Sequence, residues 1–333
     1  MKCFVTGASG FVGANLVQAL TARGHTVKAL IRPDSDRSGL AGAAYEAVGA
    51  DLQDRPALTA ALRGCDWCFH VAASYHLWLP DYAPMYAANV EGTRSVLTAA
   101  ADAGCQRIVY TSTVGCLALP EQGPEGVIPA DESRTAPLEQ VVKNPYKHSK
   151  WLGEEVAREL AGQGMPVVIV NPSAPVGPRD SKPTPTGQII LDFLRRRLPA
   201  YLDTGLNWVH VRDVAEGHIL AAEKGRIGER YLLGNGEGNW TLKQALDTLA
   251  EITGIPAPGF QAPYWLAYAG ALAAEGWAKL SGQRPKAPLA GVRMARYKMF
   301  FDPSKAVRDL GLPQTPPRQA LADAVDWFRP RAT

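Results

Sequence analysis

The sequence predicts an α/β protein, a doubly wound parallel sheet of the Rossmann kind followed by a smaller C-terminal lobe. A short apolar strand at the start breaks into regularly spaced glycines, and β-rich segments then alternate with helical patterns as far as Val170. Beyond Val170 the alternation becomes irregular. A chain of 333 residues, 46% of them apolar, is long enough for one large α/β domain and a lobe. Alternating strands and helices place a ligand crevice at the carboxyl ends of the strands.

The first thirteen residues, MKCFVTGASGFVG, join a buried strand to a helix through glycines. Gly7 permits a sharp turn, Gly10 lets the backbone approach a pyrophosphate, and Gly13 lets the helix pack close to the strand. The free N–H groups at the helix start attract the same anion. The residues that we expect to bind a dinucleotide here are Thr6, Gly7, Gly10, Phe11, Val12 and Gly13.

The second strand, residues 26–31, ends at Arg32, about twenty residues beyond the glycine turn, where the adenosine ribose would lie. An arginine there suits a 2′-phosphate, so Arg32 favours NADP. Asp34 is a nearby carboxylate that keeps NAD open, as does an ordinary surface role for Arg32. The third strand, residues 45–50, ends in Asp51-Leu52, which we expect beside the adenine.

Two further strands bring small and hydroxylated residues to the crevice. The strand over 67–71 ends in Val71-Ala72-Ala73, and small side chains there leave room for a flat ligand. The strand over 107–110 runs into Thr111-Ser112-Thr113, whose hydroxyls we expect to face the crevice. Between them, the helix over 84–104 contains Asn89 among apolar neighbours. A buried amide needs a partner, so we expect Asn89 to brace the strand ends and to be one of the residues that bind the dinucleotide.

Asn144-Pro145 predicts the start of a helix that contains Tyr146 and Lys150. Residues four apart share one helix face, so both side chains project together. A free phenol titrates near ~10, and a neighbouring ammonium and a positive nicotinamide ring both lower that pKa. We therefore expect Tyr146 to act as acid and base, Lys150 to hold the nicotinamide ribose, and Thr113 to hydrogen-bond the substrate oxygen.

The chain resembles the extended short-chain dehydrogenase/reductase superfamily, in its NAD-dependent epimerase/dehydratase group. The segments that support this resemblance are Thr6–Gly13, Asp51-Leu52, Thr111–Thr113, Tyr146–Lys150 and 210–215, HVRDVA. More narrowly, the segments 70–73, 170–173, 177–180, 182–187 and 201–210 resemble hopanoid-associated sugar epimerases, with dihydroflavonol-4-reductase-like enzymes as relatives. The resemblance implies that Thr113, Tyr146 and Lys150 are catalytic and that Pro172 and Ser173 lie by the nicotinamide.

Two departures from the group's pattern bear on the reaction. Dehydratases of the group carry a carboxylic acid just after the hydroxyl residue, whereas Thr113 is followed by Val114-Gly115, which disfavours dehydration. Epimerases that recycle a bound cofactor commonly carry an acid where this chain has Arg32. Three functions stay open: a sugar epimerase, an NADPH-dependent ketone or aldehyde reductase, and a regulator that only senses NADP. Such regulators usually lose the Tyr-Lys pair, which this chain keeps.

In the second half, the strand over 206–211 is expected to return to the sheet, with Asp213, Thr241 and Ser304 as helix N-caps. We expect residues 1–173 to form the dinucleotide-binding domain, with 206–235 returning to it. Residues 174–205 and 236–333 would form the substrate lobe. A polar loop over 179–186 would hold a sugar or phosphate, or be solvated. The expected substrate contacts are Tyr75, Val114, Arg179, Lys182, Thr186 and His210.

Composition narrows the partners. The net charge of +3 is dispersed, which argues against nucleic acid, and the first strand leaves no room for a signal peptide, so we expect a cytoplasmic protein. Cys65 and Cys68 lack a second ligand pair, so buried thiols are favoured over a metal site. The apolar segment 264–280 contains two charges and is expected to be a helix over the substrate lobe, or one whose aromatic side chains touch a membrane or lipid. A homodimer stays open.

Overall fold

The computed structural model describes residues 1–332 apart from 125, 282, 284, 286 and 287, and it has the predicted α/β architecture. Within these residues, seven parallel strands form the large sheet in the order β11-β8-β5-β4-β1-β2-β3. These strands are β1 (Lys2–Thr6), β2 (Thr26–Leu30), β3 (Glu46–Val48), β4 (Trp67–His70), β5 (Arg107–Thr111), β8 (Val167–Pro172) and β11 (Arg230–Leu233).

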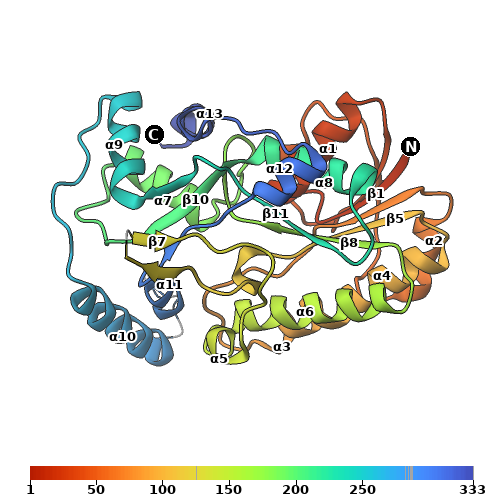
Figure 1. Ribbon diagram of the computed structural model, residues 1–333, viewed down its shortest axis with the longest axis horizontal. Coiled ribbons are helices and arrows are strands. Elements are labelled where there is room, and N and C mark those ends of the chain that lie inside the picture. The colour runs from red at the N-terminus through yellow and green to blue at the C-terminus, as the bar shows by residue number, and fades with distance from the viewer. Residues whose placement is uncertain (125, 282, 284, 286–287, 333) are drawn as a thin grey trace.

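Helices cover both faces of this sheet (Figure 1). On one face lie α1 (Phe11–Ala22), α8 (Val211–Lys224) and α12 (Ser304–Leu310), and on the other lie α2 (Arg55–Leu62), α4 (Gly92–Asp102) and α6 (Pro145–Gly162). The strand order reverses between β1 and β4, so the chain opens a crevice at the carboxyl ends of these two strands.

The lobe is built on a smaller sheet, with β12 (Asn239–Thr241), β10 (Gly205–His210) and β13 (Lys298–Met299) in order and β9 (Ala174–Val176) also paired with β10. Its core is formed with α7 (Pro185–Leu194), α9 (Leu242–Thr253) and α13 (Pro317–Ala332). The remaining elements are α3 (Ala83–Tyr86), α5 (Leu138–Val141), α10 (Tyr264–Ser281), α11 (Leu289–Met294) and the hairpin of β6 (Glu121–Gly123) and β7 (Gly126–Ile128).

The strand that returns to the large sheet is β11, which pairs with β8. The expectation that residues 206–211 would do so is wrong, because β10 pairs with β9, β12 and β13. The helix expected over 84–104 begins one residue earlier and contains a π-helical turn over Ala87–Glu91. That extra-wide turn directs the buried Asn89 toward its partners.

The predicted helix caps are correct in two of four places. The side chain of Asn144 accepts a hydrogen bond from the Lys147 N–H, and Thr241 forms a capping box with Gln244. Asp213 does not cap α8; instead, the Nδ1 of His210 accepts from the Arg212 N–H, and Asp213 lies inside the helix.

Ser304 is likewise the first residue of α12 and not its cap, because Pro303 holds the capping position. The Ser304 N–H donates to the carboxylate of Asp302 at 2.9 Å. All five cysteines are buried, as expected for Cys65 and Cys68. No helix in the described part of the chain is long and apolar enough to cross a bilayer.

Candidate active site

The glycine turn has the backbone geometry that the sequence predicts. Gly7 lies in the left-handed region at φ 65°, and a Cβ there would come within 2.7 Å of the Ala72 backbone at the end of β4. A Cβ on Gly13 would lie 2.1 Å from the Gly7 carbonyl oxygen. Gly10 precedes α1, and no side chain caps the helix start there. The first amides of α1 are therefore left for an anion, which fits a dinucleotide pyrophosphate.

A buried hydrogen-bonded chain begins at this turn. The Oγ1 of Thr6 lies 2.8 Å from Nδ1 of His70, whose Nε2 lies 3.2 Å from Oγ1 of Thr93. Thr93 is in turn hydrogen bonded to the phenol of Tyr110. Burial lowers the pKa of His70 to about 3, so the ring is neutral. Sequence reasoning missed Thr93 and Tyr110, which look like ordinary interior residues of a helix and a strand.

This series of buried hydrogen bonds ends at Lys150, which is 2% exposed. Its ammonium donates to the Tyr110 hydroxyl at 3.0 Å and to the Thr111 carbonyl oxygen at 2.7 Å. Burial lowers the pKa of Lys150 to about 8. The two acceptors therefore fix the position of a charge that the interior does not favour.

Tyr146 contacts Thr113, one of the two other residues expected to be catalytic. Its phenol is hydrogen bonded to the side chain of Thr113, and its ring packs edge-on against Tyr75 with centroids 4.3 Å apart. Burial, followed by Tyr75 and Cys116, raises the pKa of Tyr146. The expectation that Lys150 lowers the pKa of Tyr146 is therefore wrong, since the protein's own groups raise this pKa. The ammonium of Lys150 is instead hydrogen bonded to Tyr110 and Thr111. The positive charge of a nicotinamide ring is the second cause that the sequence analysis named.

Of the three hydroxyl-bearing residues at the end of β5, only Thr113 lies beside Tyr146. The Thr111 hydroxyl is 2.9 Å from Nε2 of His218 on α8, and the Ser112 hydroxyl donates to Glu154 on α6. Successive side chains of a strand point to opposite faces, so these two are directed into the helix layers. Thr113 lies just beyond the strand and reaches the crevice, which corrects the expectation for Thr111 and Ser112.

A buried ion pair supports this strand end from below. Glu154 accepts from Arg230 at 2.9 Å and from Asn171 at 2.8 Å, in addition to Ser112. The Asn171 amide also donates to the Thr113 carbonyl oxygen at 3.0 Å. Sequence reasoning missed this pair, although Glu154 follows Lys150 by four residues and so lies on the same face of α6.

The remaining residues expected to bind the cofactor lie around the crevice with different partners. Arg32 is exposed just after β2, Asp51 is exposed and accepts from the Gln53 N–H, and Leu52 lies against Gly92. Val71 and Ala73 follow β4, and Pro172 ends β8. Ser173 donates to Asn207 at 2.9 Å.

Asn89 braces the protein itself. Its amide oxygen accepts from the Ser74 N–H at 2.7 Å, and its amide nitrogen donates to the Ser74 carbonyl and the Ser149 hydroxyl. These contacts agree with the expected bracing of the strand end. Direct binding of the dinucleotide by Asn89 stays a prediction.

Of the expected substrate residues, the structure brings Tyr75 to Tyr146. Val114 is instead packed in a small apolar cluster, and His210 is buried with both ring nitrogens bound, to the Arg212 N–H and to Asp323. The side chains of Val114 and His210 are therefore used inside the protein. The expectation that they contact the substrate is wrong, and both have a structural role.

The loop expected over 179–186 is partly helical, because α7 begins at Pro185. Thr186 donates to the Pro175 carbonyl at 3.0 Å, and Lys182 is exposed. Arg179 donates to the Gly39 carbonyl at 3.3 Å and lines a hollow beside α1. Their contact with a substrate stays a prediction.

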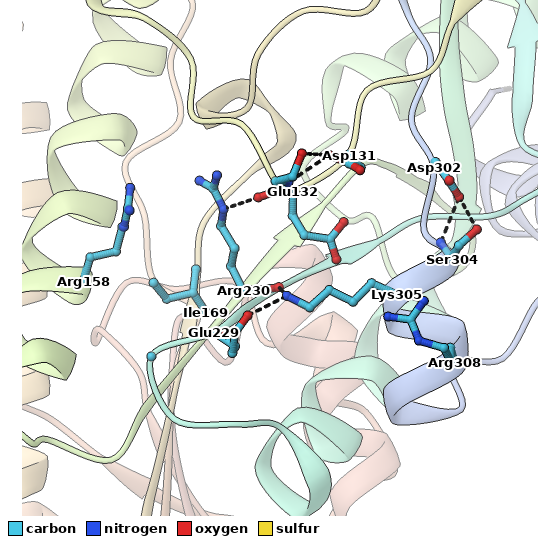
Figure 2. A pocket seen from close by; sticks show the side chains of 12 residues that line it. Asp131, Glu132, Arg158, Ile169, Glu229, Arg230, Asp302, Ser304, Lys305 and Arg308 are labelled. Atoms are coloured by element: carbon cyan, nitrogen blue, oxygen red, sulfur yellow. Dashed lines mark hydrogen bonds and ion pairs between the residues drawn. The ribbon is translucent and has the colours of Figure 1, made fainter.

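A separate hollow of about 550 Å³ lies at the edge of the large sheet beside β11 (Figure 2). Its charges are paired: Lys305 pairs with Glu229 at 2.7 Å, and Arg230 pairs with Glu154 at 2.9 Å. Arg158 on its rim follows Tyr146 by twelve residues of α6, which is about 18 Å along the helix. This hollow is therefore distinct from the crevice.

Comparison with known proteins identifies the family. Residues 3–234 match the model of the NAD dependent epimerase/dehydratase family. The chain belongs to this family. It is 47% identical over 98% of its length, and 94% of the relative's, to a putative dihydroflavonol 4-reductase of Synechocystis. It is 38% identical to sterol demethylase protein B of Methylococcus capsulatus over 99% of both chains.

A solved nucleoside-diphosphate-sugar epimerase from Pseudomonas aeruginosa has the same fold, with a TM-score of 0.80, 30% identity and coverage of 99% of this chain and 98% of that one. The resemblance to the epimerase/dehydratase group and to dihydroflavonol-4-reductase-like enzymes is confirmed. The epimerase/dehydratase member described here is an NAD(P)-dependent enzyme of the extended short-chain dehydrogenase/reductase type. The hopanoid-specific resemblance stays a prediction.

Proposed function

We propose that this epimerase/dehydratase family member is an NADPH-dependent ketone reductase with a catalytic group of Thr113, Tyr146 and Lys150. The observation that supports it most is the hydrogen bond between Tyr146 and Thr113 at the end of β5, one helical turn from the buried Lys150. Two hydroxyls that meet at one point can both hydrogen-bond a carbonyl oxygen of a substrate. Val114 and Gly115 follow, where a dehydratase would carry its acid.

Each residue has a distinct task in this reaction. Thr113 orients the substrate carbonyl by a hydrogen bond to its oxygen, and Tyr146 delivers a proton to that oxygen. The phenol of Tyr146 is protonated at neutral pH and so carries the proton to be delivered. Burial raises its pKa, and the positive charge of a nicotinamide ring would counter that rise. Lys150, fixed by Tyr110 and Thr111, would hold the nicotinamide ribose. The dinucleotide would supply the hydride to the carbonyl carbon.

The preference for NADPH rests on Arg32. Its guanidinium is exposed beyond β2, where a 2′-phosphate would be close to it. The first amides of α1 would hold the pyrophosphate, and the small residues after β4 would leave room for the nicotinamide half.

The substrate class is inferred from the named relatives. A dihydroflavonol and a sterol are both polycyclic, and a sterol is largely apolar, so we propose a ketone on a polycyclic apolar framework, which is reduced to the corresponding alcohol. A hopanoid-linked polyol is the other substrate class expected from the sequence. The second candidate function is sugar epimerisation, favoured by the nucleoside-diphosphate-sugar epimerase of the same fold. A cytoplasmic location and a homodimer, which were considered from the sequence, are also proposals.

One set of assays separates these functions. The purified protein is given NADPH with a dihydroflavonol or a sterol ketone, and separately a nucleotide sugar without reductant. A reductase consumes NADPH in step with the alcohol formed, whereas an epimerase converts the sugar with no net loss of cofactor. Tyr146→Phe should lower ketone reduction by roughly a thousandfold while NADPH still binds. If the wild-type protein binds NADPH but converts neither substrate, the sensing regulator is supported instead, and full reductase activity in Tyr146→Phe would contradict the role given to Tyr146.

A further inference from the structure

The outer face of α10 is apolar from Trp265 to Trp277. Trp265 and Trp277, near its two ends, are 70% and 66% exposed, and Leu266 and Leu272 are about half exposed. At 100° per residue the exposed residues span about 160° of the helix surface. Between Trp265 and Trp277 the exposed residues are Trp265, Leu266, Ala269, Gly270, Leu272, Ala273, Gly276 and Trp277, and none of these is polar or charged. Single exposed apolar residues are common, but a continuous apolar stripe of this size is typical of an interaction surface.

The opposite face of α10 attaches the helix to the protein. Ala271 and Ala278 are buried, and the carboxylate of Glu275 accepts a hydrogen bond from the Leu289 N–H at the start of α11, at 2.9 Å. Figure 1 shows α10 beside α11 at the outer edge of the molecule, away from the large sheet. The tryptophans are therefore directed outward by the way the helix is anchored.

The sequence from the last turns of α10 to β13 is strongly basic. From Gly276 to Phe301 the sequence contains six lysines and arginines and no aspartate or glutamate. Arg293 and Arg296 on and after α11 are exposed, and no ion pair joins either to another described residue. A second copy of the same basic surface would be repelled by this charge. An anionic bilayer would be attracted by it, and each basic side chain near the surface would add to that attraction.

We propose that α10 lies in the headgroup region of an anionic membrane, with Trp265 and Trp277 inserted and Arg293 and Arg296 at the lipid phosphates. Tryptophan suits this depth because its ring is apolar and its N–H polar. The helix lies on the bilayer and does not cross it. This docking is independent of the reaction proposed above.

The docked face is connected to the candidate active site through α11. A Cβ on Gly291 would lie 3.5 Å from Leu77, in the segment whose Tyr75 packs on Tyr146. If the substrate is the apolar ketone proposed above, it would reach Tyr146 from the membrane side past this segment. That second step rests on the proposed function, whereas the docking does not.

Co-sedimentation with vesicles tests the docking. Wild-type protein is mixed with vesicles of phosphatidylcholine alone and of equal parts phosphatidylcholine and phosphatidylglycerol. We expect binding to the anionic vesicles, and a fall of about tenfold or more in Trp265→Ser/Trp277→Ser and, by charge alone, in Arg293→Gln/Arg296→Gln. Ile227→Ser is the matched control, since Ile227 is 51% exposed in the turn before β11. NADPH titration shows that each variant is folded.

Three results would overturn the docking: no sedimentation of wild type, equal binding to the two vesicles, or binding that the tryptophan pair does not alter. A fourth overturning result would come from sedimentation velocity without lipid. If the wild type were a dimer and the tryptophan variant a monomer, this face would be a self-association surface. The same samples are assayed with a sterol ketone and with a water-soluble ketone. Vesicle binding without reduction of either ketone would leave the docking intact and would contradict the proposed function.

Discussion

The Nζ of Lys150 and the phenol of Tyr110 lie 3.0 Å apart in the interior of the protein, where neither is accessible to solvent. Lys150 is the donor, so the Tyr110 hydroxyl is left to donate to Thr93. Thr93 donates to the Asn89 carbonyl at 2.8 Å, so it accepts from Nε2 of a neutral His70. Tyr110 thus connects the ammonium to the chain of hydrogen bonds that ends at the glycine turn.

Removal of this phenol should release Lys150 without removing its charge. In Tyr110→Phe the ammonium loses one of its two acceptors, and a hydrogen bond to a charged group contributes about 1.5–3 kcal/mol. We expect kcat/KM for the ketone to fall by roughly tenfold or more. Tyr231→Phe is the matched control, because it too loses a buried hydroxyl that is hydrogen bonded, to the Arg226 N–H. Equal losses in both variants would reduce Tyr110 to a packing residue.

The pH dependence of the reaction should report Lys150. Its pKa is lowered by burial from 10.5 to about 8, so the ammonium is lost from the folded protein as the pH rises through about 8. We expect kcat/KM to fall above that pH, and the descending limb to move to lower pH in Tyr110→Phe, because the ammonium is then less well solvated. Between pH 8 and 10.5 the unfolded chain holds this proton more tightly, so the contribution of Lys150 to the free energy of unfolding rises with pH. A limb that does not move in the variant would contradict the assignment.

The large sheet could be predicted because its information is local. Each strand is a short apolar run, and each crossover helix follows with its own caps or glycines, so β1 to β5 and β8 appear in the sequence in order. The lobe is different, because β10 pairs with β9, β12 and β13, which are short and come from three other parts of the chain. Nothing in residues 206–211 tells which sheet they join.

The same contrast divides the site. The spacing of Tyr146 and Lys150 fixes them on one face of α6, and the glycine positions fix the turn, since both are set by local geometry. The direction of Thr111 and Ser112 depends on which helix each one meets, and the acceptors of Lys150 depend on strands brought together only by folding. Burial, Tyr75 and Cys116 raise the pKa of Tyr146, and because these surroundings too are assembled only by folding, the direction of the shift could not be predicted.

Cofactor preference should change with Arg32. Arg32→Glu places a carboxylate where a 2′-phosphate is expected, so we predict that the Kd for NADPH rises by at least about tenfold while the Kd for NADH falls or stays the same. Fluorescence titration measures both constants. Arg63→Glu, at the end of α2, makes the same charge change at another exposed arginine and should leave both constants unaltered. If both variants weakened NADPH binding equally, the effect of Arg32 would be one of overall charge and not of a contact with the 2′-phosphate.

Loss of either partner of the buried pair Glu154–Arg230 should strongly lower the free energy of unfolding. Their side chains are 1% and 10% exposed, and Glu154 also accepts from Ser112 and Asn171. Glu154→Gln leaves the guanidinium without its counter-charge, and loss of one partner of a buried pair costs about 3–5 kcal/mol. Urea unfolding should show this loss in Glu154→Gln and a smaller one in Glu154→Gln/Arg230→Met, because no unpaired charge remains in the double variant. If the double variant is instead less stable by the sum of the two single changes, the two groups act independently and the pair does not hold the strand end beneath Thr113.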